Sequence, residues 1–251
     1  MIYAIGDIHG QVTMLGAMLK QLREQPLREE DTVVFLGDYI DRGENTRATI
    51  EMLLEFRQEH ANTIFLRGNH EQLMLDARRE GAPQAAQRAG YLMFGEMTLT
   101  WLQNGGTDAL DSYGINDYSD WFENIPEEHW EFVENTRIEY VVSGYHFVHA
   151  GLVPPGVRWH MAGTGLEPRL WIRDEFLKST ADFEGRIVVF GHTPQMSGRP
   201  LIQPTKLGID TGAVFGGPLT AAIIDISLPP TAQSVRFLNI WREEAMQDAI
   251  E

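Results

Sequence analysis

The residue types that follow five short apolar runs of this sequence could bind metal ions and phosphate. The runs and the polar residues that end them cover 2–7, 32–38, 63–69, 145–151 and 187–192, and the side chains at or near their ends include Asp7, His9, Asp38, Asn69, His70, His149 and His192. Carboxylate, imidazole and amide groups suit Mn²⁺, Fe or Zn²⁺, and one carboxylate can bridge two ions roughly 3.5–4 Å apart. This set predicts a site for two divalent ions, in which Asp38 is the natural bridging ligand.

Each of these motifs also has a structural interpretation when it is taken alone. An aspartate after a strand often caps the next helix, and the segment around Asn69 could be a turn that opens a helix. His149 could be a core histidine bonded to a backbone carbonyl, and His192 could be a turn residue before Thr-Pro. The joint occurrence of all five motifs, in order along the chain, favours a common site. The other histidines lie outside such motifs, and we expect surface or core positions for His60, His129, His146 and His160.

The elements that must position these side chains form an alternating pattern of strands and helices. Each apolar run has the length of a buried strand, about 4–6 residues. Residues 12–22 and 46–56 carry apolar side chains on one helical face and separate the first three runs. This alternation predicts an α/β fold built on a largely parallel sheet. Ligands of such folds bind beyond the carboxyl ends of the strands, so the candidate metal ligands should converge there.

The remainder of the chain divides into a helical stretch and a β-rich end. We expect residues 84–134 to form a mostly helical insertion, interrupted at 104–114, within a single domain that spans residues 1–251. Residues 137–151 predict a hairpin around a Ser-Gly turn. Antiparallel strands, which indicate a second sheet, are expected at 206–212, 219–226 and 234–241.

The composition limits the partners of the chain. Its 36 acidic side chains outnumber 20 lysines and arginines, which gives a formal net charge of −16 at pH 7. A surface of this charge repels polyanions, so we expect no nucleic-acid partner. The absence of cysteine excludes disulfides and thiolate ligands. We find no targeting signature and no run of 18 apolar residues, so we expect a cytoplasmic protein without a membrane partner.

Five motifs, GDIHGQ, GDYIDRGENT, LRGNHE, HAG and GHTP, resemble those of the calcineurin-like metallophosphoesterases. GDYIDRG and LRGNHE are similar in particular to the PPP-type serine/threonine protein phosphatases, and GIDTGAVFGGPLT at 208–220 resembles a signature of the bacterial and lambda-phage members. The motifs span residues 5–220, but none of them covers the insertion. The resemblance implies a β-sandwich of two mixed sheets flanked by helices, and a metal-dependent phosphatase that hydrolyses phosphoric monoesters.

The resemblance also implies a role for each matched residue at the metal centre. One ion would be held by Asp7, His9 and Asp38, and the other by Asp38, Asn69, His149 and His192. A hydroxide that bridges the two ions would attack phosphorus directly, without a phosphoenzyme. We expect Mn²⁺ as the metal, with Fe, Zn²⁺, Ni²⁺ and Mg²⁺ as alternatives, because availability rather than ligand type often decides the native ion.

The motif residues that do not bind metal would handle the proton and the phosphate. The resemblance makes His70 the general acid that protonates the leaving group, and Asp41 the partner that orients its ring. Arg42 would clamp the phosphoryl oxygens, because a guanidinium group can bind two of them at once.

A second arginine clamp is expected between the HAG and GHTP motifs, since the family carries one there. We choose Arg173, which we place on a helix, and Arg169 is the alternative. Arg67 either ties the motif loops together or shares phosphate binding, and Asn69 would contact the substrate as well as the metal.

Three competing functions share some of these features. A symmetrical dinucleoside polyphosphate hydrolase has the same metal ligands but carries Val-Ala-Arg-Gly where this chain has Ile-Asp-Arg-Gly, so Asp41 favours the protein phosphatase. A broad small-molecule phosphatase and a catalytically idle scaffold compete with it as well. The expected substrate is a phosphorylated protein or peptide, or a small phosphate ester, and the sequence leaves the oligomeric state open.

Overall fold

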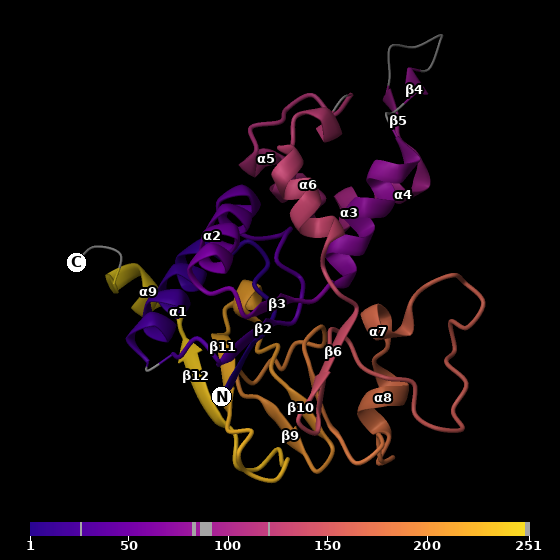
Figure 1. Cartoon of the computed structure of the whole chain (residues 1–251). Coiled ribbons are helices and arrows are strands. Elements are labelled where there is room, and N and C mark those ends of the chain that lie inside the picture. The colour runs from indigo at the N-terminus through magenta and orange to yellow at the C-terminus, as the bar shows by residue number, and fades with distance from the viewer. Residues whose placement is uncertain (26, 82–83, 86–91, 120, 249–251) are drawn as a thin grey trace.

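The computed structural model describes residues 1–25, 27–81, 84–85, 92–119 and 121–248, and its main feature is a pair of five-stranded sheets (Figure 1). The first sheet has the strand order β12-β11-β1-β2-β3, with β1 (Ile2–Ile5), β2 (Thr32–Phe35), β3 (Thr63–Phe65), β11 (Leu219–Ile224) and β12 (Arg236–Ile240). The second has the order β6-β7-β8-β10-β9, with β6 (Glu139–Val142), β7 (Tyr145–Val148), β8 (Ile187–Phe190), β9 (Leu201–Gln203) and β10 (Lys206–Gly208). Both contain parallel and antiparallel pairs, so the predicted sandwich of two mixed sheets is confirmed.

Strand β1 shows how the sheets pack. Its side chains alternate between two faces, as in any strand. Ile2 and Ala4 lie in a core cluster that also contains Tyr145 and Phe147 of the second sheet. The intervening residues Tyr3 and Ile5 lie in a different cluster, which the helices share. The strand is therefore buried on both faces, which explains its continuous apolar sequence.

Helices cover the outer face of each sheet. Helices α1 (Val12–Glu24) and α2 (Thr46–Glu59) follow the first two strands as predicted, and α3 (Asn69–Glu80) follows the third. All three contribute to the core cluster on the first sheet. Helix α9 (Arg242–Asp248) packs against α1. The shorter α7 (Pro168–Trp171) and α8 (Asp174–Lys178) lie by the second sheet, where Phe176 packs on Val188 and Phe190.

The insertion is mostly helical, as predicted, and lies above the sheets in Figure 1. It contains α4 (Glu96–Trp101), α5 (Thr107–Ser112), a 3-10 turn (Trp121–Glu123) and α6 (Glu127–Glu134), after a two-stranded β4 (Gln84–Ala85) and β5 (Leu92–Met93). The interruption expected at 104–114 is shorter than predicted, because α5 occupies most of that stretch. The connection between α4 and α5 (Leu102–Gly106) is kinked at Gly105, whose φ of 111° is not helical and redirects the chain. Residues 86–91 and 120 of the expected insertion lie outside the described residues.

The hairpin is confirmed, because β6 and β7 pair antiparallel. The prediction that the last three runs form one second sheet is wrong. Strand β10 joins the second sheet parallel to β8, whereas β11 and β12 extend the first sheet antiparallel to β1 and to each other. The apolar pattern marks a strand but does not specify its partner. That residues 1–251 form a single domain stays a prediction.

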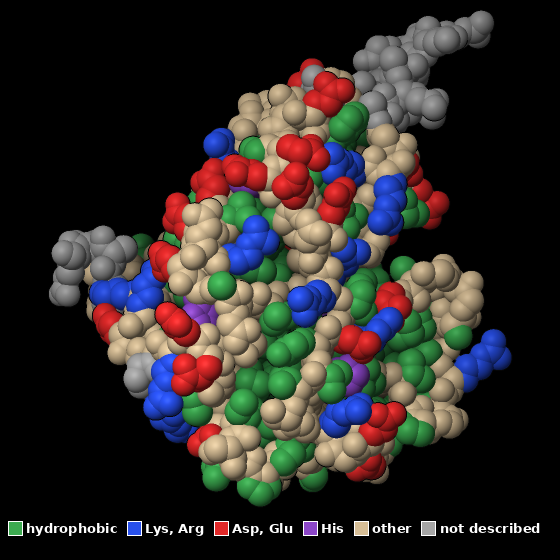
Figure 2. Space-filling model, in the orientation of Figure 1, with side chains coloured by type: hydrophobic (Ala, Val, Ile, Leu, Met, Phe, Trp, Pro, Cys, Tyr) green, Lys and Arg blue, Asp and Glu red, His purple; other side chains and the backbone are tan. Residues whose placement is uncertain are grey.

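The surface agrees with the acidic composition. On the face in Figure 2, acidic side chains gather over the insertion helices and apolar side chains over the sheets below. Among the described residues, no helix combines the length and the apolar character needed to cross a membrane.

Candidate active site

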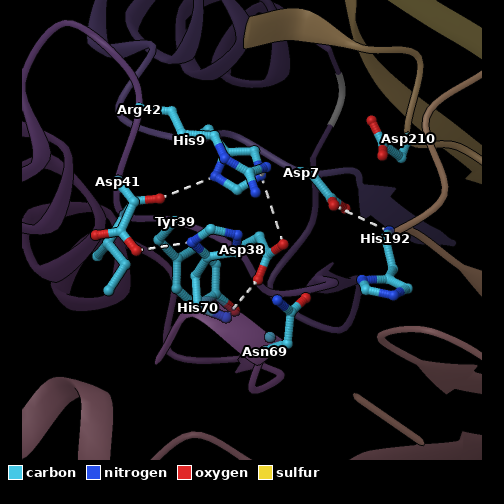
Figure 3. A network of polar contacts seen from close by, with 12 residues as sticks. Asp7, His9, Asp38, Tyr39, Asp41, Arg42, Asn69, His70, His192 and Asp210 are labelled. Atoms are coloured by element: carbon cyan, nitrogen blue, oxygen red, sulfur yellow. Dashed lines mark hydrogen bonds and ion pairs between the residues drawn. The ribbon is translucent and has the colours of Figure 1, made fainter. Parts of the chain in front are cut away.

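The loops after β1, β2, β7 and β8 and the first turn of α3 meet at one place (Figure 3). Asp38 lies at its centre, and two sets of side chains each bring one ligand atom per residue within 4.8 Å of one another: His9, Asp38 and His70, and Asp38, His149 and His192. The predicted convergence at the carboxyl ends of the strands is therefore observed. Asp38 belongs to both sets, which is the position that a bridging ligand would have.

Several of these residues have a strained backbone. A positive φ is uncommon for residues other than glycine and raises the free energy of the fold, and such residues gather at functional sites. Five residues of the site adopt it: His9 (47°), Asp38 (51°), Asp41 (71°), Arg42 (65°) and His192 (62°). The loops therefore hold these side chains in directions that a relaxed turn would not give.

The ring of His149 directs one nitrogen at oxygen ligands. Its Nδ1 lies 2.9 Å from the carbonyl oxygen of Leu36, which can only accept, so Nδ1 carries a proton. Its Nε2 lies 3.0 Å from Oδ1 of Asn69 and 3.4 Å from Oδ2 of Asp38. Although burial lowers the pKa of His149, the Asp38 carboxylate raises it to about 10. Positive charge, whether a proton or a metal ion, is favoured at this point.

His9 has the same arrangement on the other side of Asp38. Its Nδ1 donates to the carbonyl oxygen of Ile40 at 2.9 Å, and its Nε2 lies 3.5 Å from Oδ2 of Asp38. Burial lowers the pKa of His9 to about 3, so the ring is neutral at physiological pH. A neutral imidazole whose other nitrogen donates to a carbonyl is the usual form of a metal-binding histidine.

Asp7 supplies a further sign of a cation site. Its Oδ2 accepts from the backbone N–H of His192 at 2.9 Å. Its Oδ1 is buried and has no hydrogen-bond partner among the residues that the structure describes. Burial, together with the nearby Asp210, raises the pKa of Asp7. Because an unpaired buried carboxylate oxygen is costly, a metal ion would stabilise it, and the donor set fits divalent ions.

His70 and Asp41 form a buried pair. Nδ1 of His70 lies 2.7 Å from Oδ2 of Asp41. The indole Nε1 of Trp101 donates to both oxygens of the same carboxylate at 3.1 Å. Burial raises the pKa of Asp41 and lowers the pKa of His70 to about 4. His70 lies within the first set of ligand atoms, but Asp41 occupies its Nδ1, so Nε2 is its free nitrogen.

Two arginines contact histidines that flank Asp38. Nη1 of Arg42 donates to Nε2 of His9 at 3.1 Å, and Nε of Arg173 donates to Nε2 of His192 at 3.1 Å. Arg173 was expected on a helix, and this is wrong: α7 ends before it at Trp171, and Arg173 is the capping residue that precedes α8. Its extended neighbour Ile172 separates the two helices, and this break aims Arg173 at the site.

Comparisons with known proteins agree with this geometry. The family model of the calcineurin-like phosphoesterases matches residues 1–204. The chain belongs to the calcineurin-like phosphoesterase family. It is therefore a metal-dependent enzyme that hydrolyses phosphoric esters, and the resemblance of its motifs is confirmed.

This phosphoesterase is similar to a curated protein phosphatase at moderate identity and to solved structures at low identity. Serine/threonine-protein phosphatase 1 of Salmonella typhimurium is 31% identical over 235 residues, which cover 89% of this chain and 91% of the relative. A putative diadenosine tetraphosphatase is 17% identical with a TM-score of 0.58 and covers 96% and 94% of the two chains. A serine/threonine phosphatase from Saccharomyces cerevisiae is 14% identical with a TM-score of 0.51 and covers 96% and 79%. At these identities the structural neighbours show the fold alone.

The other candidate arginines of the phosphoesterase are engaged elsewhere. Arg169 forms ion pairs with Glu139 at 2.9 Å and Glu167 at 2.7 Å, and lines a separate cavity of about 370 Å³ with His146. The guanidinium of Arg67 donates to Oγ1 of Thr136 at 3.0 Å and to other groups at the junction of α6 and β6. This geometry favours the first expectation for Arg67, that it ties loops together.

The site also contains two acidic residues that the motif analysis did not name as site residues, Glu71 and Asp210. The carboxylate of Glu71 accepts from the backbone N–H groups of Gly68 at 2.7 Å, Asp38 at 2.9 Å and Tyr39 at 2.8 Å, so it fixes the loop that carries Asp38. Burial chiefly raises the pKa of Asp210, which lies beside Asp7, to about 6 (Figure 3). In the sequence, these two residues were marked only by their places in motifs: Glu71 ends LRGNHE, and Asp210 is the aspartate of GIDTG.

The remaining histidines lie on the surface or in the core, as predicted. His60 and His129 are buried and bond to the Asp31 carbonyl and the Tyr113 hydroxyl. His146 pairs with Glu139 at 2.8 Å, and the exposed His160 pairs with Glu175.

Proposed function

We propose that this chain is a dinuclear-metal phosphomonoesterase whose substrates are phosphoserine and phosphothreonine in proteins or peptides. The observation that carries the proposal is the buried pair of His70 and Asp41 beside the candidate metal centre. An alkoxide is a poor leaving group, so the release of serine or threonine needs a proton donor. A phosphate anion leaves more easily and needs less protonation. The 31% identity with the Salmonella protein phosphatase supports the same substrate class.

The metal ligands that we propose are those of the motifs. One ion would be held by Asp7, His9 and Asp38, and the second by Asp38, Asn69, His149 and His192. Bound divalent ions supply a nucleophilic water at neutral pH and neutralise charge on the phosphoryl oxygens. The unpartnered Oδ1 of Asp7 and the inward Nε2 of His149 support this assignment. We propose Mn²⁺ first, and Fe, Zn²⁺, Ni²⁺ and Mg²⁺ are the alternatives.

In this proposal, Arg42 and Arg173 bind the phosphoryl group of the substrate. The two guanidinium groups contact histidines on either side of Asp38, so a phosphoryl group placed over Asp38 would lie between them. A guanidinium binds such a group through two parallel hydrogen bonds, which a lysine cannot do. Asn69 would add its amide N–H₂ once its oxygen faces the metal.

Proton delivery follows from the orientation of His70. Asp41 accepts from Nδ1, and this bond fixes the ring so that Nε2 faces the site. The ring would donate to the leaving oxygen from Nε2 in its doubly protonated form, after Nε2 has taken up a proton from water. Positioned general acids of this kind contribute about 10²–10⁴-fold to a rate.

A substrate panel tests the proposal. The protein is loaded with Mn²⁺, Zn²⁺ or Mg²⁺ and assayed with phosphoserine, phosphothreonine and phosphotyrosine peptides, p-nitrophenyl phosphate, a cyclic phosphodiester and diadenosine tetraphosphate. We expect the highest kcat/KM for phosphoserine or phosphothreonine peptides. Faster cleavage of diadenosine tetraphosphate contradicts the proposal, equal rates on all monoesters indicate a small-molecule phosphatase, and no turnover indicates a scaffold.

A further inference from the structure

The kinked connection between α4 and α5 lies against the two side chains that we propose handle the proton and the phosphate. Trp101, the last residue of α4, and Asn104 and Gly105 of the connection contact the loop that carries Asp41 and Arg42. We infer that residues 101–106, here called the positioning segment, set the direction of the proton-donating pair through Trp101 and of the phosphate clamp through Asn104 and Gly105. The inference rests on the proposed phosphomonoesterase function and adds to it two positioning contacts from outside the motifs.

Trp101 acts on the Asp41 carboxylate. Its indole N–H lies 3.1 Å from each oxygen, and the side chain is fully buried. Trp101 and His70 are the side chains that donate to this carboxylate in the described part of the chain. Because the indole N–H is equally far from both oxygens, it fixes the orientation of the Asp41 carboxylate. That orientation determines how Oδ2 accepts from Nδ1 of His70.

Asn104 and Gly105 act on Arg42. The backbone N–H of Arg42 donates to the carbonyl oxygen of Gly105 at 3.3 Å, and its Nε donates to the carbonyl oxygen of Asn104 at 3.2 Å. These two bonds occupy the backbone N–H and the Nε of Arg42. The terminal nitrogens Nη1 and Nη2 are therefore left to bind an anion. Nη1 faces the metal centre, where it contacts His9. The segment thus restricts an otherwise flexible arginine to one direction.

The two adjacent glycines of the segment are required by these contacts. A Cβ atom on Gly105, whose φ is 111°, would lie 2.6 Å from Cγ of Arg42. A Cβ atom on Gly106 would lie 2.7 Å from the indole ring of Trp101. Each distance is too short for a side chain, so one glycine makes room for the clamp and its neighbour for the tryptophan.

The two contacts predict different kinetic defects. Trp101→Phe keeps an aromatic ring but removes the N–H, so it should impair proton donation. We expect kcat for a phosphoserine peptide to fall about 10- to 100-fold, the range for the loss of a supporting hydrogen bond. For p-nitrophenyl phosphate, whose leaving group needs little protonation, we expect a loss of roughly threefold or less.

Gly105→Ala should instead displace the clamp. Arg42 binds phosphoryl oxygens whatever the leaving group, so kcat/KM should fall by the same factor for both substrates. Binding of inorganic phosphate to the Mn²⁺-loaded protein, measured by calorimetry, should weaken about tenfold or more, whereas Trp101→Phe should leave it unchanged. This binding measurement does not depend on turnover.

Trp121→Phe is the matched control. Trp121 is fully buried and its ring lies 4.7 Å from that of Trp101, but its Nε1 has no hydrogen-bond partner among the described residues. The Trp121→Phe variant should lose about as much thermal stability as Trp101→Phe. It should keep the wild-type ratio of kcat for the phosphoserine peptide to kcat for p-nitrophenyl phosphate. If Trp101→Phe does not fold, Gly106→Ala replaces it, because the added methyl group displaces the same indole.

The outcomes separate the inference from the proposed function. The inference is supported if Trp101→Phe lowers kcat much more for the phosphoserine peptide than for p-nitrophenyl phosphate, while Gly105→Ala lowers kcat/KM equally for both. Trp121→Phe should show the same ratio of the two activities as the wild type. Equal losses on both esters for Trp101→Phe, or unchanged phosphate binding for Gly105→Ala, overturn it while the wild type stays a phosphatase. A wild type that hydrolyses neither ester overturns the proposed function, and the inference with it.

Discussion

Nδ1 of His70 lies 2.7 Å from Oδ2 of Asp41, and the two side chains are 1% and 0% exposed. Water therefore does not compete for this hydrogen bond, and the pair behaves as one unit. The backbone N–H of His70 also donates to Oδ1 of Asp38 at 3.1 Å. The same helix turn thus joins the candidate bridging carboxylate to the candidate proton donor.

Replacing Asp41 by asparagine should impair proton transfer and spare the metal centre. Asparagine keeps the shape but removes the charge that supports the imidazole, so kcat for a phosphoserine peptide should fall about 10²-fold or more. Metal content, measured by elemental analysis, should stay within error of the wild type. An equal loss of bound metal would instead place Asp41 among the ligands.

Replacing Arg42 by alanine should remove transition-state binding. The loss of one charged donor to a developing phosphoryl charge typically costs about 3 kcal/mol, or roughly 10²-fold in kcat/KM. Arg42→Lys should recover little, because a lysine restores the charge without the planar fork. Near-normal kcat/KM in Arg42→Ala would refute the clamp.

Arg173 and Arg169 offer a matched comparison, since they are four residues apart and only one contacts the site. We expect Arg173→Ala to lower kcat/KM at least tenfold, because its guanidinium lies 3.1 Å from His192. Arg169→Ala should retain activity, since its partners are Glu139 and Glu167. A larger loss of kcat/KM in Arg169→Ala than in Arg173→Ala, measured in a steady-state assay, would instead assign the clamp to Arg169.

Glu80 should make the stability of the insertion depend on pH. Its carboxylate accepts from the backbone N–H of Met97 at 3.1 Å and of Thr98 at 2.9 Å, in the first turn of α4. Burial opposes the charged form, but these hydrogen bonds outweigh it and lower the pKa of Glu80. A pKa that is lower in the folded state stabilises the fold above the unfolded pKa, and this contribution is lost as the pH falls through the folded pKa.

We therefore expect Glu80→Gln to lower the free energy of unfolding by roughly 0.5–1 kcal/mol at pH 7, as the loss of a partly exposed helix cap does. The difference from the wild type should shrink below about pH 4, where the glutamate itself becomes protonated. Urea denaturation at several pH values measures it, with Glu55→Gln on the exposed face of α2 as the control. A pH-independent difference would argue against the charged cap.

The strands next to the site were predictable for a physical reason. A parallel strand that is buried on both faces has a continuous apolar sequence, and β2 and β8 are buried at every position. Strand pairing was less predictable, because apolar residues mark both β10 and β11 as buried strands but do not show that they lie in different sheets. The Asn-Gly-Gly of residues 104–106 looked like a loop, since glycine disfavours helices, although here close packing requires both glycines.

Some residues of the candidate site could be predicted from the sequence and others could not. The proposed metal ligands were found because each follows a strand, and the strand ends meet at one edge. Trp101 was missed because a tryptophan in an apolar helix gives no sign of where its N–H points. Glu71 was missed because its partners are backbone groups, which have no sequence signal. Contacts that depend on the packing of distant elements are visible only in the folded chain.

The most direct test of the account is the metal content of the purified protein. After equilibrium dialysis against Mn²⁺, we expect two ions per chain in the wild type. Asp38→Asn, which alters the shared member of both ligand sets, should bind fewer than one ion, while His160→Ala on the exposed surface should bind two. A wild type that binds no ion, or an Asp38→Asn variant that still binds two, would contradict the dinuclear centre.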